Sequence, residues 1–271
     1  MLILLPPSEG KTPPVLGKPL DLATLGSPGL TGAREKVIEA LVELCSAGHD
    51  PHLPVQNGIL AERAAGVLGV GHTQLDLVLA NGRLRTAAAT RADRLYTGVL
   101  YDALDFGSLS STARRRAGTR VAITSSVFGL VRPGDAIPAY RLSGDVTLPG
   151  LGPVAAHWRG HLGPAVEDRM GSGLLVDLRS SMYAAFWRPP AALADRVATV
   201  RVLHEHNGTR KVVSHFNKAT KGRIVRAVLE GGAHPRTPAQ LADVLRDLGW
   251  KVEEAEPSRK GTQLDVVVDA I

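Results

Sequence analysis

A short stretch near the middle of the chain gathers many of the side chains that could do chemistry. Residues 120–124 form an apolar run typical of a buried strand. Glycines and prolines between residues 129 and 138 then interrupt regular structure. Around these breakers lie hydroxyls, two arginines and a carboxylate: Ser125, Ser126, Arg132, Asp135, Tyr140 and Arg141. A strand that leads into such a rigid loop is typical of a binding site on a scaffold. The alternative is an ordinary connection in which Arg132 and Asp135 pair with each other.

A lysine follows the first predicted strand. Residues 2–5 are apolar, and Ser8 and Lys11 come after a pair of prolines. The sequence Gly-Lys-Thr at residues 10–12 matches the end of a P-loop, but the first glycine of that motif is missing and prolines lie on both sides. We therefore exclude a nucleoside triphosphate loop. Lys11 either lines a site at the end of the strand or is solvated on a stiff loop.

Three cations lie near the start of a helix predicted over residues 217–229. Lys218, Lys221 and Arg223 fall within its first two turns. Positive charge there opposes the helix dipole, so these residues are poorly placed for local stability. An anion bound at this end of the helix would explain them.

A further apolar run, at residues 173–178, ends in Asp177, with Tyr183 shortly after it. In an open α/β sheet, strand ends and helix starts converge on one crevice. We expect a common site there for Lys11, Ser126, Arg132, Tyr140, Arg141, Asp177, Tyr183, Lys218 and Lys221. Asp135 and Asp177 would repel phosphate, which favours a pocket with chemistry or small-ligand specificity over a surface built only for DNA.

Two helices joined by a Gly-Val-Gly turn are predicted over residues 58–80. Gly69 and Gly71 allow positive φ angles and expose backbone N–H groups before the second helix. This spacing is similar to a helix-hairpin-helix element, which holds DNA phosphates without reading sequence. The alternative is a plain helical turn that needs glycine for its geometry.

The remaining pattern predicts one domain of mixed α/β or α+β class. Helices are expected at 31–45, 155–168 and 237–248, the last capped by Thr237, and a strand at 95–101. Hairpins are expected across residues 207–208 and at the end of the chain. No repeat or composition shift marks a domain boundary.

The composition restricts the class of protein. The chain has 271 residues, of which 44% are hydrophobic, so it can bury a sizeable core. Its net charge of +6 permits an anionic partner. The single cysteine, Cys45, cannot form an internal disulfide and is expected in the core. No signal peptide or membrane span is evident, so we expect a cytoplasmic protein that does not enter a membrane.

Several blocks in order along the chain resemble the YaaA peroxide-stress family. They are Met1-Leu-Ile-Leu-Leu with Lys11-Thr12, Tyr96-Thr-Gly, Ser126-x-x-Gly-Leu-Val-Arg-Pro-x-Asp135 with Pro138 and Tyr140-Arg-Leu142, Asp177-Leu-x-Ser-x-x-Tyr183, and Lys218-x-x-Lys-Gly-Arg223. The family usually has Ser-Pro-Ala-Lys-Thr after the first strand, which differs from the residues here and indicates a divergent branch. The resemblance implies a single YaaA-like "cantaloupe" domain over residues 1–271 with a mixed sheet flanked by helices. It also implies a helix-hairpin-helix-like insert at about 58–80, a basic cleft that binds DNA, and a role in limiting oxidative damage. No metal or organic cofactor is implied.

Two functional hypotheses follow. The first is a DNA-binding oxidative-stress protein whose DNA- or anion-binding residues are Lys11, Gly69, Gly71, Ser126, Arg132, Tyr140, Arg141, Lys218, Lys221 and Arg223. The second is an enzyme that acts on a nucleotide, a damaged base or another anionic small molecule in the same cleft. Its candidate catalytic residues are Lys11, Lys218, Lys221, Asp135 and Asp177, with a lysine of lowered pKa as nucleophile or base.

Overall fold

The central strand of the fold is β1 (Leu2–Leu5), all four residues of which are buried. The computed structural model describes residues 1–46, 54–206 and 209–269. In it β1 pairs in parallel with β3 (Val121–Ser125) on one side and with β8 (Leu175–Asp177) on the other. The chain thus leaves β1 toward one neighbour and returns later to the opposite one. Such a reversal of strand order separates the loops at the carboxyl ends of the strands and creates a crevice between them.

The main sheet has eight strands and is mostly parallel, as predicted for the mixed α/β class. Its order is β11-β12-β9-β8-β1-β3-β4, with β10 also paired to β9. The strands not yet given are β4 (Gly129–Val131), β9 (Val197–His206), β10 (Thr209–Lys211), β11 (Lys251–Glu254) and β12 (Thr262–Asp269). Two small antiparallel pairs lie outside this sheet, namely β2 (Ala89–Arg91) with β5 (Ala136–Pro138) and β6 (Thr147–Leu148) with β7 (Gly152–Pro153).

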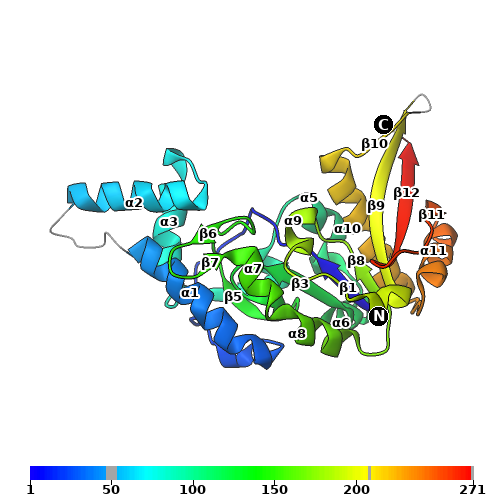
Figure 1. The fold of residues 1–271 in the computed structure, drawn as a ribbon, viewed down its shortest axis with the longest axis horizontal. Coiled ribbons are helices and arrows are strands. Elements are labelled where there is room, and N and C mark those ends of the chain that lie inside the picture. The colour runs from blue at the N-terminus through cyan, green and yellow to red at the C-terminus, as the bar shows by residue number, and fades with distance from the viewer. Residues whose placement is uncertain (47–53, 207–208, 270–271) are drawn as a thin grey trace.

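Helices surround this sheet and extend the molecule at one end (Figure 1). The α-helices are α1 (Thr31–Ser46), α2 (Pro54–Leu68), α3 (Leu75–Gly82), α4 (Ala92–Leu95), α5 (Val99–Leu104), α6 (Ser111–Arg120), α7 (Val154–Arg159), α8 (Leu162–Met170), α9 (Ser181–Ala184), α10 (Ser214–Gly231) and α11 (Pro238–Asp247). Short 3-10 turns occupy Leu22–Thr24, Pro28–Leu30, His72–Gln74, Phe106–Ser108 and Ala191–Arg196. Helices α2 and α3 project beyond α1, at the opposite end of the long axis from α10.

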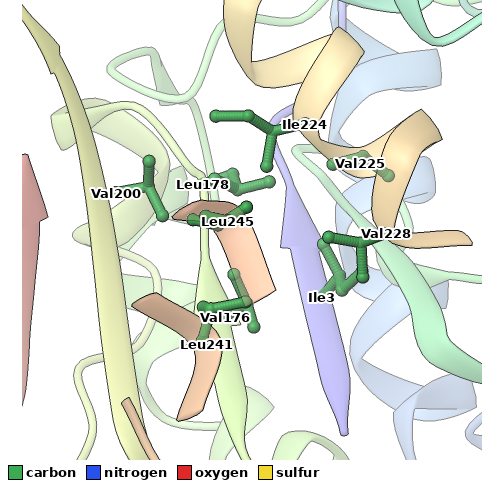
Figure 2. Close-up of a pocket in the computed structure, with 9 residues that line it drawn as sticks. All are labelled: Ile3, Val176, Leu178, Val200, Ile224, Val225, Val228, Leu241 and Leu245. Atoms are coloured by element: carbon green, nitrogen blue, oxygen red, sulfur yellow. The ribbon is translucent and has the colours of Figure 1, made fainter. Parts of the chain in front are cut away.

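One face of the sheet packs against α10 and α11, and a small gap between them is lined by apolar side chains. Figure 2 shows these side chains around a gap of about 10 Å³: Ile3, Val176, Leu178, Val200, Ile224, Val225, Val228, Leu241 and Leu245. A gap of that size, without a polar group, is a packing space of the core rather than a ligand site.

Several sequence-based predictions of the elements are confirmed. The first strand, the helix from Thr31 and the closing hairpin are present. Thr237 caps α11, because its hydroxyl accepts a hydrogen bond from the backbone N–H of Gln240 at 3.2 Å. Strands β9 and β10 pair as predicted, although the turn at residues 207–208 lies outside the described residues.

Three predictions of the elements are wrong. Residues 95–101 are not a strand, because Gly98 has a φ angle of +93° and separates α4 from α5. The helix predicted over 155–168 is two helices, α7 and α8, with a break at Gly160. Helix α10 begins at Ser214, three residues earlier than predicted.

The close packing of α10 on α5 depends on Gly222 and gives a prediction. A Cβ atom there would lie 2.2 Å from the Leu100 carbonyl oxygen and 3.0 Å from the Leu104 nitrogen, both rigid backbone atoms. We expect Gly222→Ala to lower the free energy of unfolding by about 2 kcal/mol through overpacking. Gly66→Ala is the matched control, since Gly66 is an exposed residue of α2 with open space where the methyl group would lie, and it should be neutral or raise stability by about 1 kcal/mol. Urea unfolding of both variants tests this, and equal effects would contradict it.

Candidate functional site

A cleft of about 390 Å³ lies at the carboxyl ends of β1 and β8. Three chain segments and one side chain of α10 line it: residues 6–10 after β1, residues 97–101 at the start of α5, residues 180–183 around α9, and Lys218. Residues 6–10 follow β1 and residues 180–183 follow the neighbouring β8, so these two segments lie at the carboxyl ends of adjacent parallel strands. The cleft is large enough for a ligand of mononucleotide size.

Lys11 lies just behind the first of these segments in a largely aromatic environment. Its Nζ atom donates hydrogen bonds to the backbone carbonyl oxygens of Ser8 at 2.8 Å and Glu9 at 3.3 Å. The same atom lies 4.2 Å from the ring centroid of Tyr140 and 5.6 Å from that of Tyr96. The segment after β1 therefore folds back over its own lysine.

This environment lowers the pKa of Lys11 to about 7. The largest cause is burial, followed by the positive charge of Arg141, while Glu9 acts weakly in the opposite direction. A neutral lysine has two N–H donors and one lone pair. Because two carbonyl oxygens accept from this amine, its lone pair is available as a base or nucleophile near neutral pH.

Buried hydroxyl groups support the ring beneath this lysine. The hydroxyl of Tyr140 is hydrogen-bonded to that of Tyr96 at 2.9 Å and to Ser125 Oγ at 2.8 Å, and Ser125 Oγ also accepts from the Phe128 N–H at 3.0 Å. Burial raises the pKa of both tyrosines well above the ordinary value. Both rings therefore remain neutral and fixed at physiological pH. Ser126 lies outside the cleft, since it is fully buried and its hydroxyl donates to the Leu142 carbonyl at 2.6 Å.

Arg141 is held on the other side of Lys11 by a buried amide. Asn81, which is fully buried, accepts from the Arg141 N–H at 2.9 Å and donates to the Arg141 carbonyl at 2.8 Å. The Arg141 side chain is 17% exposed, and its Nη1 atom lies 3.3 Å from Glu9 Oε2. Arg141 thus reaches the lip of the cleft, where Glu9 is part of the lining.

The two carboxylates predicted for the site are each neutralised by an arginine. Asp135 accepts from Arg132 Nε at 2.9 Å, from the Arg132 N–H at 2.9 Å and from the Gly26 N–H at 3.1 Å. This is the local pairing that the sequence left as an alternative, and it fixes the loop after β4. Asp177 accepts from Arg179 Nε at 2.9 Å and Nη2 at 2.7 Å. Neither carboxylate faces the cleft as a free base.

The cations of α10 differ in exposure. Lys218 and Arg223 are exposed, and within the described part of the chain neither takes part in an ion pair. Lys221 is half-buried, its Nζ atom donates to the Leu178 carbonyl at 3.2 Å, and burial lowers its pKa against the opposing effect of Asp177. Because α10 begins at Ser214, only Lys218 falls within its first two turns, so the predicted clustering at the helix start is wrong.

Comparison with known proteins gives one family. The model of the family described as peroxide stress protein YaaA matches residues 1–256. The chain belongs to the YaaA peroxide stress family. It is 50% identical over 273 residues to a UPF0246 protein of Streptomyces coelicolor, a match that covers all of both chains. It is also 40% identical to a UPF0246 protein of Corynebacterium efficiens, over 98% of this chain and all of that one. A UPF0246 protein of Corynebacterium glutamicum is 36% identical over the same share of this chain. No helix in the described part of this YaaA-family chain is both long and apolar enough to cross a membrane.

The glycine turn between α2 and α3 lies apart from the cleft in this YaaA-family chain. Gly69 has a φ angle of +63°, whereas Gly71 has an ordinary φ of −78°. The N–H groups of Gly69 and Val70 donate to carbonyl oxygens at the end of α2, at 3.3 and 3.0 Å. These two groups therefore cap a helix and are not free to bind a phosphate.

Sequence reasoning missed three polar residues that shape the site. Asn81 and Arg179 hold Arg141 and Asp177, as described above. Arg34 is fully buried and donates to the carbonyl oxygens of Gly26 at 2.7 Å, Phe128 at 3.0 Å and Leu130 at 2.9 Å. Asn81 and Arg34 each lie within helices, where a polar residue normally indicates a solvated face, so no local signal identified them.

The low pKa of Lys11 predicts a pH dependence of stability. Between pH 7 and about 9.5 the unfolded chain keeps a proton on Lys11 that the folded protein has released, so stability rises with pH by up to about 1.4 kcal/mol per pH unit from this group. We expect Lys11→Met to lose this contribution and to show a flatter profile. Urea unfolding across this pH range measures the difference. Lys36→Met, which removes an exposed lysine of α1, should retain the wild-type slope, and parallel profiles for Lys11→Met and the wild type would refute the prediction.

Proposed function

We propose that this YaaA-family protein is a cytoplasmic peroxide-stress protein that binds DNA across the cleft. The observation that supports this most directly is the pair of exposed cations on α10. Lys218 lines the cleft, and neither it nor Arg223 has an acidic partner within the described residues. Unpaired surface cations beside a hollow attract phosphate groups.

Of the other predicted contacts, Arg141 meets the cleft through its ion pair with Glu9, and Lys11 and Tyr140 lie behind the segment of residues 6–10. Arg132 is partly neutralised by Asp135, and Lys221 is engaged with the Leu178 carbonyl, so both contribute less. The turn at Gly69 and Gly71 is not part of the cleft lining, and the N–H groups of Gly69 and Val70 cap α2, so we expect this turn to contribute little. Contacts of this kind fall mainly on phosphates, so we expect little sequence specificity.

The DNA proposal predicts that affinity for a duplex falls as salt concentration rises, and that Lys218 and Arg223 account for part of this dependence. Fluorescence anisotropy with a duplex across a salt series should give a linear fall of log K with log salt concentration. We expect Lys218→Gln/Arg223→Gln to reduce the slope by about 1.8, which corresponds to two lost phosphate contacts.

Lys36→Gln/Lys260→Gln is the matched control, because it removes the same charge from two exposed lysines outside the cleft. It should leave the slope close to that of the wild type. A wild-type protein that binds no duplex at low salt, or two double variants with the same slope, would refute DNA binding at the cleft.

A second candidate function is favoured by the amine of Lys11. Lys218 is solvated, and Asp135 and Asp177 are bound to arginines, so Lys11 is the strongest of the candidate nucleophiles or bases. An amine with a free lone pair beside a nucleotide-sized cleft suits an enzyme that acts on a nucleotide or a damaged base.

This candidate predicts a covalent trap on DNA that carries an abasic site, whose open sugar is an aldehyde. The Lys11 nitrogen would bond to the aldehyde carbon, water would leave, and hydride from cyanoborohydride would reduce the imine to a stable secondary amine. We expect mass spectrometry to locate the adduct on Lys11 and Lys11→Arg to abolish it. Lys221→Arg, which changes the other half-buried lysine of lowered pKa, should keep the adduct. An adduct on another lysine, or none, would rule out this chemistry for Lys11.

A further inference from the structure

The backbone of Arg141 is held in place, but its guanidinium is incompletely bonded within the described residues. The fully buried Asn81 holds this backbone, since its amide donates to the Arg141 carbonyl and accepts from the Arg141 N–H. The Nε atom of Arg141 is buried and makes no hydrogen bond to any described residue. A buried donor without a partner is costly, so a group that accepts from it is strongly favoured.

Glu9 is a weakly held partner for this arginine. Its side chain is 77% exposed, and its contact with Arg141 is a single ion pair at 3.3 Å. Glu9 also lines the cleft, on the segment that connects β1 to Lys11. An exposed ion pair of this kind contributes about 1 kcal/mol or less, so another anion can replace the Glu9 carboxylate without a large loss of stability.

Lys11 lies beside the same position. The charged and titratable groups that face its amine are Arg141, Glu9 and the rings of Tyr96 and Tyr140. Both tyrosines are neutral, as argued above. An anion that replaced the Glu9 carboxylate would therefore lie between one permanent cation and one amine that can gain a proton.

We infer that Arg141 and Lys11 form a phosphate subsite at the inner side of the cleft, and that Glu9 occupies it until the phosphate of a nucleotide-sized ligand replaces the carboxylate. A guanidinium fork and a protonated lysine match the two charges and the several acceptor oxygens of a phosphate monoester. The cleft of about 390 Å³ accommodates the rest of such a ligand. This inference rests on the proposed function in one respect, namely that the cleft receives a phosphate-bearing ligand.

Phosphate binding at this subsite is coupled to uptake of a proton. The amine of Lys11 is mostly neutral above pH 7, because burial and Arg141 lower its pKa to about that value. A phosphate dianion in contact with the amine favours the ammonium form more strongly than the exposed Glu9 does. At pH 8 a phosphate monoester is already a dianion, so a proton taken up there is bound by the protein.

Isothermal titration calorimetry with 2′-deoxyadenosine 5′-monophosphate tests the subsite. Titrations at pH 8 in phosphate-free buffers of different ionisation enthalpy give both affinity and proton uptake. We expect the wild type to bind the nucleotide with uptake of nearly one proton and to bind 2′-deoxyadenosine far more weakly. Glu9→Gln should bind the nucleotide about fivefold more tightly, because the competing carboxylate is gone. Lys11→Met should lose the proton uptake, and Arg141→Gln should lose most of the affinity.

Glu256→Gln is the control for removal of an exposed carboxylate away from the cleft and should behave as the wild type. The inference would be overturned if Glu9→Gln bound the nucleotide no more tightly than the wild type, or if the wild type took up no proton. It would also be overturned if the nucleoside bound as tightly as the nucleotide, or if no nucleotide bound at millimolar concentration. Duplex anisotropy on the same variants separates the two proposals. If the nucleotide binds and the duplex does not, the DNA proposal is refuted and the subsite is supported. If the duplex binds and the nucleotide does not, the subsite is refuted and the DNA proposal is supported.

Discussion

The parallel pairing of β1 with β3 on one side and β8 on the other is the constraint on which the site depends. All four residues of β1 are buried, so its position in the sheet is set by the core and not by the groups around the cleft. The chain that leaves β1 must pass between the loops that follow its two neighbours. Lys11 follows this segment, and the residues at the start of α5, around α9 and at Lys218 of α10 form the rest of the cleft wall. The position of the site therefore follows from the strand order. The close packing of α10 on α5 at Gly222 in turn sets the position of Lys218 at the cleft.

The distribution of charge around this crevice follows one pattern. Two buried carboxylates each pair with an arginine close in sequence. Arg132 precedes Asp135 by three residues, and Arg179 follows Asp177 by two, so each charge is balanced within its own loop. Balanced pairs of this kind avoid the large cost of an isolated buried charge. Lys11 has no such partner among the described residues, where two carbonyl oxygens accept from its amine and Glu9 contacts Arg141. Burial therefore lowers its pKa to about 7, whereas Lys218 and Arg223 of α10 are exposed to solvent.

The sequence predicted the class of fold, most of the sheet strands and the family, but only part of the site. Strands such as residues 2–5 are continuous apolar runs, and a run of this kind is buried in almost any fold. The groups at strand ends were expected to converge. Tyr183 and Lys218 line the cleft, while Lys11 contacts the Tyr140 ring and Arg141 pairs with Glu9 of the lining. What a single sequence could not give is the identity of the partners that neutralise or hold each group. Asn81 lies 60 residues before Arg141, and Arg34 lies 94 residues before Phe128, so both bonds exist only once the chain is folded. The same holds for Gly69, which has the expected positive φ yet is not among the residues that line the cleft.

The membership of a peroxide stress family raises the question of which group would respond to peroxide, and the cysteine of this chain is a poor candidate. Thiolates, not thiols, react readily with peroxide. Cys45 is the single cysteine in the sequence, it is buried on α1, and burial raises its pKa to about 11. The thiol therefore stays protonated and out of reach of solvent at physiological pH. If this chain limits oxidative damage, a buried and protonated thiol is a poor group for consuming the oxidant, and the groups left to consider are those at the cleft: the Lys11 amine, the Arg141 guanidinium and the exposed Lys218. Under the proposals made above, these groups would bind an anionic ligand.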